Sequence, residues 1–480
     1  MVRRFHATAN THRMSIPFAR CAPVSSSQLS ALVWPGPRYT AYPTTDRFVE
    51  AHTSKQLTQA LQLRRANAAT TAIPLSVYIH IPFCESLCYF CACNKNVTRD
   101  HGLARKYLAY LGRETDLYAD FLGAGQPVSQ LHLGGGTPTF LSNQELAALV
   151  AKLGAVFNLA KGGEFTIEVD PRSVNASRLR VLASLGFNHL RIGIQDTDAA
   201  VLKAVHRAQP AAGLVDLVSA SRDLGFESVT LDLMYGLPFQ SPDSFARTLE
   251  SALEARPDRI ALYAYAHMPE RFKSQRRLSA GTLPGATARM AQLLQSISTL
   301  IDAGYEHLGM HQFALPGDAL ATAKRQGRLH CNFHGYSALP DGDLLGLGVS
   351  STGRMGASCS QNTKILSDYC DRLERGHLPV MSGLAMSRDD LLRRAVIMAV
   401  MCHGQLDVES IELAFLIDFR KYFGAELESL QNMEELGVVT VDRDGFSLTQ
   451  AGWYVASAVA MVFDRHQRED QKRAAFSRVL

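Results

Sequence analysis

The sequence predicts an α/β fold: a partial (β/α)6 barrel of the TIM type, preceded by an N-terminal arm and followed by a mostly helical C-terminal domain. Short β-rich runs alternate with amphipathic helix-like runs between about residues 75 and 301. This alternation is typical of a parallel sheet with right-handed crossovers. No G-x-G-x-x-G motif follows the first β-rich run, so a barrel fits better than a dinucleotide-binding fold. After about residue 370 the pattern changes.

Six β-rich runs would form the barrel strands. They are Ser76–Ile81, Gln130–Leu133, Glu164–Val169, His189–Ile194, Ser228–Leu233 and Arg259–Tyr265. The helix-like runs between and after them are Ala104–Leu122, Asn143–Phe157, Ser177–Leu185, Ala212–Leu224, Pro242–Glu254 and Thr287–Ile301. Gly186, Gly225 and Gly304 each follow a helix-like run, where glycine readily adopts the left-handed conformation that ends a helix. These stops support the division into β/α units.

The flanking segments complete a division into an arm (1–70), the barrel with a C-terminal extension (71–370) and a winged-helix-like domain (371–480). In the arm, three prolines make Pro35–Thr44 irregular, and Lys55–Arg65 has a helical pattern.

The last domain has clear local signals. Ser387 begins a capping pattern, with Asp390 three residues on, that opens a helix through Met401. Asp444-Gly445 predicts a hairpin between residues 438–441 and 446–448, and Gly452–Phe463 has a helical pattern. A domain of this type can bind DNA, but we expect this one to pack on the barrel instead.

The composition is that of a soluble globular enzyme. Of the 480 residues, 46% are hydrophobic and 20% are charged, and the formal net charge is +4. A charge so near balance does not indicate a nucleic-acid partner. No run of roughly eighteen apolar residues could span a bilayer, so no membrane span is expected.

Cysteine usage points to a reducing compartment. Four of the nine cysteines fall within ten residues, and the other five are scattered. Such clustering in a long chain is typical of metal or redox chemistry rather than of a disulfide scaffold. We therefore expect a cytoplasmic, monomeric protein. Residues 1–45 contain arginines but no Asp or Glu, so an organellar transit peptide is the alternative, and Met14 is an alternative start.

Cys84, Cys88 and Cys91 form the most informative motif. They follow the first β-rich run, and in a βα barrel the carboxyl ends of the strands carry the active site. Thiolates spaced C-x3-C-x2-C on one loop can bind three irons of a [4Fe–4S] cluster and leave the fourth iron open to a cofactor or substrate. A zinc site would normally use two separate pairs or added histidines. His80 could be a ligand or could simply be packed in the strand. Cys93 could be a fourth ligand, but it is so close to Cys91 that both could bind one cluster only with strain.

The C-x3-C-x2-C spacing, with Phe90 before the last cysteine, resembles the signature of the radical S-adenosylmethionine (SAM) superfamily. The string YIHIPFC…CYFCACNK…TR is similar to its oxygen-independent coproporphyrinogen III dehydrogenase (oxidase) branch. Similar motifs run through most of the chain: GPRYTAYPT, LHLGGGTPTFL, IEVDP, RIGIQD, LDLMYGLP, YAYAHMP, DLLGLGVSS and the terminal FSRVL. The resemblance implies that the partial barrel is a radical SAM barrel.

The resemblance also implies a reaction. In such enzymes the cluster donates one electron to SAM, and the resulting 5′-deoxyadenosyl radical takes a hydrogen from a propionate of coproporphyrinogen III. Loss of carbon dioxide and one further electron leaves a vinyl group. Two propionates react, which gives protoporphyrinogen IX in haem biosynthesis. An electron donor such as flavodoxin or ferredoxin is implied.

A set of cofactor contacts follows from the same resemblance, for two bound SAM molecules. They are Tyr78, Phe90, Gly135, Gly136, Thr137, Glu168, Gln195, Arg207, Asp232, Ala266 and Thr352. Without the resemblance, the glycines could form only a tight turn, and Arg207 could be a solvated helix charge. Cys93 is implied to be a catalytic residue and not a cluster ligand; otherwise it is a small buried thiol.

Three positions depart from the family pattern after the sixth strand. The family motif GMDHFA reads GMHQFA at residues 309–314, and HRNF reads HCNF at residues 330–333. An acidic residue, a histidine and an arginine are thus lost or moved at His311, Gln312 and Cys331. The cluster motif is unaffected, so these changes bear on the identity of the substrate.

The leading hypothesis is therefore the coproporphyrinogen III dehydrogenase. The alternatives are a related radical enzyme that acts on another tetrapyrrole and a haem-binding chaperone of the same fold. Chaperone-type relatives lack the arm motif and the fourth cysteine, and both are present here. An Fe–S transcription regulator is least favoured, because the C-terminal domain has no clear basic recognition helix.

Arg38 lies beside Tyr39 and Tyr42 in the arm, and its guanidinium suits a substrate with four carboxylates. We predict that Arg38→Ala weakens substrate binding or slows turnover, because Arg38 holds a propionate or orders the arm over the barrel mouth. Anaerobic steady-state kinetics test this prediction, and an unchanged KM and kcat would remove Arg38 from the site.

Overall fold

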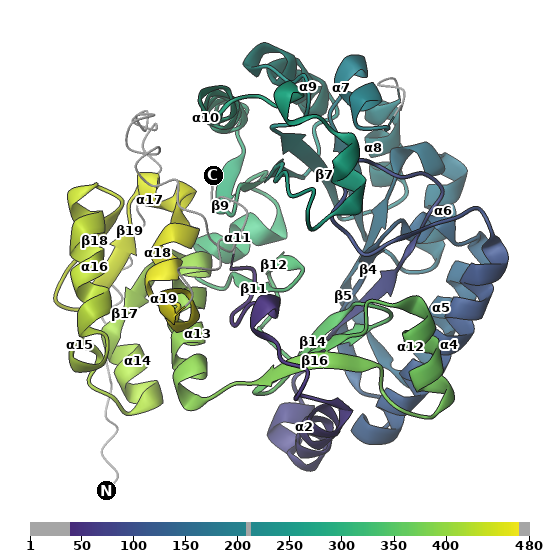
Figure 1. Ribbon diagram of the computed structural model, residues 1–480, viewed down its shortest axis with the longest axis horizontal. Helices are drawn as coiled ribbons and strands as arrows, with labels where there is room; N and C mark the ends of the chain where they lie inside the picture. Colours follow the sequence, from purple (N-terminus) through teal and green to yellow (C-terminus); the bar gives the residue numbers. More distant parts are fainter. Residues whose placement is uncertain (1–38, 208–212, 470–480) are drawn as a thin grey trace, which may run out of the picture.

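The computed structural model describes residues 39–207 and 213–469, so Arg38, the rest of the N-terminal segment and the terminal FSRVL motif lie outside the described residues. Within these ranges, a 12-stranded sheet forms an open barrel, and a second, mostly helical unit lies beside it (Figure 1). The edge strands β9 (Glu306–Gly309) and β16 (Val380–Ala385) do not pair with each other. No helix in these ranges is both long and apolar enough to cross a membrane.

Six parallel strands at the centre of this sheet confirm the predicted barrel strands. They are adjacent in chain order: β1 (Leu75–Ile81), β4 (Pro127–Gly135), β5 (Asn158–Val169), β6 (His189–Gln195), β7 (Ser228–Tyr235) and β8 (Arg259–Ala264). Their carboxyl ends consequently meet at one end of the barrel, as expected for parallel strands.

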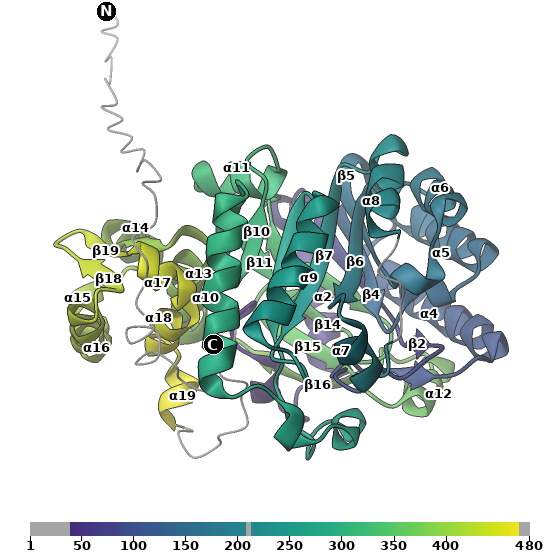
Figure 2. The ribbon, with the colours of Figure 1, turned by 90° about the horizontal axis from the view of Figure 1, so that it is seen from above.

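The predicted barrel helices also form, and they cover the outer face of the sheet (Figure 2). They are α4 (His101–Leu122), α5 (Asn143–Val156), α6 (Ala176–Ser184), α8 (Leu214–Asp223), α9 (Pro242–Glu254) and α10 (Ala286–Asp302). Local sequence sets where they begin: Ser142 and Glu145 form a capping box at α5, and Ser241 and Ser244 form another at α9.

Side chains alternate along these strands, which gives the barrel an apolar outside and a polar inside. In β1, Val77 and Ile79 belong to the hydrophobic core, whereas Tyr78 and His80 contact polar groups. Burial on both faces removes nearly all of these residues from water, so polar groups in the interior need partners.

Six further strands extend the sheet, and the sequence analysis did not predict them. Beside β1 lie β13 (Leu344–Leu347), which is parallel to β1, and then the antiparallel strands β14 (Thr352–Met355), β15 (Ser358–Asn362) and β16. Beside β8 lie β10 (Gln312–Ala314) and β9, both in antiparallel pairs. The sheet thus continues past residue 370, and the division of the chain into domains stays a prediction.

The C-terminal unit has the elements of a winged helix. As predicted, α13 (Arg388–His403) begins at a Ser387–Asp390 capping box, and a hairpin forms. The sheet order is β17 (Gln405–Asp407), β19 (Gly445–Leu448) and β18 (Val439–Val441), with α14 (Val408–Phe415), α15 (Phe419–Tyr422) and α16 (Gly424–Glu435) between β17 and β18 in the chain.

The prediction of a single helix over Gly452–Phe463 is wrong in one respect. Two short helices, α17 (Gln450–Tyr454) and α18 (Ala456–Val462), replace it. The break is at Val455, whose φ of −121° and ψ of 23° lie outside the helical range, and its N–H donates to Gly452 O in a tighter turn.

The arm runs between the barrel and the C-terminal unit (Figure 1). Its helix α2 (Ser54–Ala66) packs against α4 and β15. Tyr39 and Tyr42 are each only 1% exposed. The Tyr39 hydroxyl donates a 2.7 Å hydrogen bond to Asp464 Oδ2, which joins the arm to the end of α18. Burial raises the pKa of Asp464, and the bond from Tyr39 partly offsets that increase.

We predict that Tyr39→Phe destabilises the protein by about 1–3 kcal/mol, because it leaves a buried carboxylate without one of its donors. Urea unfolding measures the change. Tyr422→Phe is the matched control: Tyr422 also donates to an aspartate, Asp389, at 2.6 Å, but it is 42% exposed. Its loss should cost less than about 1 kcal/mol. Equal costs for the two variants would contradict a special role for the buried bond.

Candidate functional site

The cysteine loop begins immediately after β1, at the carboxyl end of the barrel strands. A short parallel pair, β2 (Phe83–Cys84) and β3 (Asn96–Val97), holds its two ends together. Asn96 N donates to Pro82 O at 2.6 Å and Thr98 N donates to Cys84 O at 2.9 Å. The predicted position of the loop at the barrel mouth is therefore confirmed.

The thiols in this loop have distinct surroundings. Cys88 is buried, and Cys84 and Cys91 are partly buried. Burial raises the pKa of Cys84 to about 11, although the Thr137 hydroxyl 3.6 Å away lowers it. A hydrogen bond from Cys93 lowers the pKa of Cys91 to about 6, toward the thiolate form that binds iron. The same contact raises the pKa of Cys93. Cys93 thus lies beside Cys91, and its role stays a prediction.

Arg207 is buried against the cysteine loop. One guanidinium nitrogen lies 3.4 Å from Cys88 Sγ and 3.2 Å from Asp170 Oδ2. Arg172 also pairs with Asp170, at 2.6 Å. Burial disfavours the Asp170 carboxylate, but the bond from Arg172 and the charge of Arg207 keep the pKa of Asp170 below its usual value. Arg207 is therefore not a solvated helix charge. Sequence reasoning missed Asp170 and Arg172, although Asp170 follows a strand in the IEVDP motif.

His80 is packed. Its Nε2 lies 2.9 Å from Asn94 O, and its Nδ1 lies 3.2 Å from the Tyr78 hydroxyl. Burial lowers the pKa of His80, which favours the neutral imidazole. Both ring nitrogens are thus engaged within the barrel wall, as the packed alternative predicted.

Two glycines let the end of β4 approach the cysteine loop closely. Gly135 has a φ of +113°, and a Cβ there would lie 2.7 Å from the His80 ring. A Cβ on Gly136 would lie 2.7 Å from Phe83 O and 3.0 Å from Cys84 Sγ. Any larger residue would push the loop away. The predicted Gly136 and Thr137 are therefore in direct contact with the cysteine loop, and Gly135 contacts β1 just before it.

Glu168, at the end of β5, is an ionised carboxylate inside the barrel mouth. His132 Nε2 lies 2.9 Å from Oε1, and Gly135 N donates to Oε2 at 3.3 Å. Burial alone would raise the pKa of Glu168, but the bond from His132 and the charges of His132 and Arg191 lower it to about 2. Because the pKa is depressed, the stabilisation from this group is present above about pH 4.5 and is lost as the pH falls toward 2.

Two more predicted residues present unsatisfied acceptors. Asp232 Oδ2 accepts from Arg191 Nε at 2.8 Å, but its Oδ1 has no hydrogen-bond partner among the described residues. Gln195, with a φ of +68°, likewise has a buried Oε1 without a partner there. Burial raises the pKa of Asp232. Buried acceptors of this kind are costly unless a ligand supplies donors, such as ribose hydroxyls or an amino group.

The remaining predicted contacts lie on three separate parts of the chain. The carbonyls of Phe90 and Ala266 both accept from Gln275 Nε2, each at 3.1 Å. Thr352 is buried at the start of β14, and Gln361 donates to its hydroxyl at 3.3 Å. Tyr78, on β1, is paired with Gly346 of the neighbouring strand β13, against which Thr352 packs.

A stack of three aromatic rings crosses the barrel interior. His334 lies flat on Tyr78, with ring centroids 3.9 Å apart, and His132 lies 5.6 Å from each of them. His334 comes from the loop between β11 (His330–Asn332) and β12 (Gly335–Ser337). Burial holds the pKa of His334 well below its usual value. His334 was not among the predicted residues, because no motif marked the short loop in which it lies.

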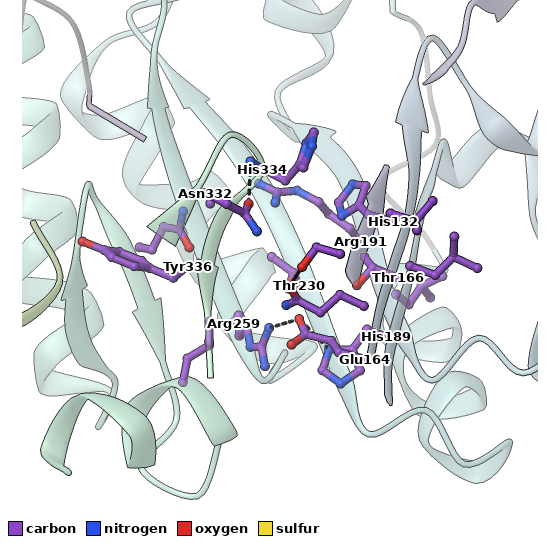
Figure 3. Close-up of a pocket in the computed structure, with 18 of the residues that line it drawn as sticks. His132, Glu164, Thr166, His189, Arg191, Thr230, Arg259, Asn332, His334 and Tyr336 are labelled. Atoms are coloured by element: carbon purple, nitrogen blue, oxygen red, sulfur yellow. Dashed lines mark hydrogen bonds and ion pairs between the residues drawn. The ribbon is translucent and has the colours of Figure 1, made fainter. Parts of the chain in front are cut away.

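Two of these rings, His132 and His334, border a polar cavity of about 70 Å³ inside the barrel (Figure 3). Arg259, Glu164 and His189 lie together at its other end, near the amino ends of the strands. Of the three departures from the family pattern, Gln312 lines this cavity and His311 and Cys331 do not. Cys331 instead donates to Thr40 O of the arm, at 3.3 Å.

The chemistry of the site residues suits the cofactors that the sequence implies. Among the described residues, no three His, Cys, Asp or Glu side chains are placed so that they could hold a single metal ion. Three thiols on one loop form a donor set suited to an iron–sulfur cluster. The glycine cradle and the unpartnered acceptors on Gln195 and Asp232 suit a polar cofactor beside it. The residues present therefore fit both groups.

Comparisons with known proteins agree with this geometry. Residues 78–252 match the radical SAM superfamily, and residues 386–455 match the HemN C-terminal domain. The oxygen-independent coproporphyrinogen III oxidase of Pseudomonas aeruginosa is 42% identical over 447 residues, which cover 93% of this chain and 96% of the relative. The chain belongs to the oxygen-independent coproporphyrinogen III oxidase family.

Other members of the family support the same assignment. The enzyme of that name from Escherichia coli K12 is 40% identical over 93% of this chain and 96% of its own. The solved structure of coproporphyrinogen III oxidase (HemN) from Escherichia coli, a radical SAM enzyme, superposes with a TM-score of 0.85 at 39% identity. It covers 89% of this chain and 97% of that one. The fold class is therefore confirmed, and family membership implies a [4Fe–4S] cluster and SAM.

We predict that Glu168→Gln weakens SAM binding at least about tenfold, since hydrogen bonds to a charged group contribute roughly 1.5–3 kcal/mol. Equilibrium dialysis with the reconstituted enzyme measures the dissociation constant. Cluster content, followed by iron analysis and visible absorbance, should stay unchanged.

Glu164→Gln is the matched control. Glu164 lies four residues earlier on the same strand, toward the amino end of the barrel, and faces the same interior. SAM affinity that is unchanged in Glu168→Gln, or reduced equally in both variants, would exclude Glu168 as a specific cofactor contact.

Proposed function

We propose that this protein converts coproporphyrinogen III to protoporphyrinogen IX by anaerobic oxidative decarboxylation in haem biosynthesis, as a radical SAM enzyme. The observation that supports this most strongly is the conjunction of the cysteine loop with the acceptor-lined barrel mouth. Relatives named for this reaction match more than nine tenths of the chain. The proposal also gives Cys93 a catalytic role and the site a second bound SAM. It further includes a monomeric state and a cytoplasmic location.

When bound, the cluster and SAM supply a one-electron reductive cleavage that generates a carbon radical able to abstract hydrogen. The thiolates of Cys84, Cys88 and Cys91 would hold the cluster, and with three protein ligands it would keep a position for the cofactor. Arg207 places a positive charge against Cys88 and balances part of the negative charge there. Gly136 and Thr137 keep the loop close to β4.

The other proposed contacts orient the cofactors. Glu168 presents an ionised carboxylate, with His132 behind it, to an ammonium group or to ribose hydroxyls. Asp232 and Gln195 offer further acceptors beyond it. The aromatic stack of Tyr78, His334 and His132 holds the His132 ring in place behind Glu168.

Reconstitution under anaerobic conditions tests the proposed reaction. The enzyme is reconstituted with iron and sulfide, reduced with dithionite and supplied with SAM and coproporphyrinogen III. We expect 5′-deoxyadenosine and a divinyl product, both detected by chromatography and mass spectrometry. Cys91→Ala should abolish both products. Cys370→Ser is the control, because Cys370 lies on α12 (Leu366–Glu374), outside the site.

The other outcomes separate the alternatives. Deoxyadenosine without a vinyl product would keep the radical chemistry and indicate another tetrapyrrole, which the changed residue Gln312 at the cavity wall would then explain. No deoxyadenosine with any reductant would favour the haem-binding chaperone.

A further inference from the structure

A short basic segment, residues 271–277, lies against the cysteine loop. It ends in a single 3-10 helix, Lys273–Arg277. Its two faces differ: Ser274 and Gln275 are buried, whereas four cationic side chains of the segment are exposed. The exposed cations are Arg271, Lys273, Arg276 and Arg277. The segment therefore has one face on the protein and one positively charged face toward solvent.

The buried face binds the backbone of the cysteine loop. Ser274 Oγ donates to Cys91 O at 2.7 Å, and Gln275 Nε2 donates to Phe90 O at 3.1 Å. Gln275 Oε1 in turn accepts from Met268 N at 2.6 Å. Only this segment would thus separate a molecule bound to the outer face from Cys91, a predicted cluster ligand. The hydrogen bond from Ser274 to Cys91 is a direct connection between the two.

The positive charge extends beyond the segment. Lys364 lies close enough to Arg271 that, together with burial, this charge lowers its pKa. Lys95 donates to Cys91 O at 3.1 Å. Arg277 lies over the Tyr89 ring, 5.2 Å from its centroid. The acidic residues here are Glu270, beside the segment, and Glu85, in the loop.

An exposed aromatic side chain lies in a loop that is bonded to the chain just after these cations. Phe239, in the loop after β7, is 61% exposed. Its N–H donates to Thr282 O at 2.8 Å, which ties it to the chain that follows the basic segment. Its φ of +63° is unusual for a residue with a side chain, so the backbone is held in a constrained conformation that presents the ring to solvent. Aromatic anchors beside charged rims are typical of protein-binding surfaces.

We propose that residues 271–277 and Phe239 form the docking surface for a small acidic redox protein that reduces the cluster. This proposal rests on the proposed function, which requires a source of electrons. One electron leaves the reduced carrier of the partner and enters the cluster, so no bond breaks and no proton is transferred in this step. The cations attract an acidic partner over long distances, and Phe239 supplies an apolar contact at close range.

The exposed cations are better suited to a protein than to the substrate. None of the four lines the cavity inside the barrel. The interior has its own cationic groups in Arg191 and Arg259, which face that cavity. Their charges are paired with Asp232 and Asp318, at 2.8 Å in each case. A propionate that entered the barrel would thus meet a different set of groups.

A charge-reversal pair tests the proposal on the reconstituted holoenzyme. The patch variant is Lys273→Glu with Arg276→Glu, and the control variant is Lys161→Glu with Arg180→Glu. The control positions are also exposed, but they lie near the amino end of β5 and on the outer helix α6. Flavodoxin, an acidic one-electron carrier, is the probe. Calorimetry gives its dissociation constant at low and high ionic strength, and stopped-flow absorbance gives the rate of cluster reduction by its hydroquinone.

We expect flavodoxin to bind the patch variant at least about tenfold more weakly at low ionic strength, with a smaller difference at high salt. Cluster reduction by flavodoxin should slow in parallel, and the control variant should match the wild type. Phe239→Ser should also weaken binding, but without changing its salt dependence. Dithionite needs no docking surface, and high salt screens the charge of this small anion, so dithionite-driven reduction and product formation at high ionic strength should be unchanged in all variants.

Equal flavodoxin affinity in the patch and control variants would overturn the proposal. Slower reduction of the patch variant by dithionite at high ionic strength as well would also overturn it, since the substitutions would then act on the cluster site itself. Failure of the proposed function is recognised separately, because the wild type with dithionite would then form no divinyl product.

Discussion

Backbone pairing between the ends of β1 and β4 determines where the cysteine loop lies. The ladder runs from Ile81, opposite Gly135, and continues past the strand, where Gly136 N donates to Ile81 O at 2.8 Å and Thr137 N donates to Phe83 O at 2.9 Å. The start of the loop is thus part of the sheet. Every other element of the site is positioned relative to this junction.

The polar barrel interior imposes a second constraint. A buried charge is stable only when it is paired and hydrogen-bonded. His132 with Glu168 joins β4 to β5, Arg191 with Asp232 joins β6 to β7, and Arg259 on β8 pairs with Asp318, the N-cap of α11 (Ala319–Arg325). Among the buried polar atoms that have no hydrogen-bond partner in the described residues are Asp232 Oδ1, on β7, and Gln195 Oε1, at the end of β6. Donor groups of a bound cofactor would give these acceptors partners.

The sequence predicted the features that depend on local or periodic signals. The six barrel strands, their helices and the capping box at Ser387 were read from side-chain alternation, glycine stops and cap spacing. Strands such as β10 and β16 pair antiparallel with an existing edge and lie outside the β/α alternation that identified the barrel strands.

The site residues divide in the same way, into those that a local motif marks and those that no motif marks. The strand-end and loop residues were found through their motifs, whereas Asp170, Arg172 and His334 were not. Their importance comes from contacts between distant segments: His334, for example, meets Tyr78, a residue more than two hundred positions earlier in the chain. Such contacts follow from tertiary packing, which a single sequence does not reveal.

The bond between Tyr39 and Asp464 also constrains the order of folding. The two residues are 425 positions apart, so the loop they close contains nearly the whole chain. During synthesis the barrel strands emerge well before Asp464, and domains generally begin to fold as they appear. The start of the arm at Tyr39 cannot make this bond until Asp464 has been synthesised. The barrel strands are therefore complete in sequence before the arm can be fastened at that end.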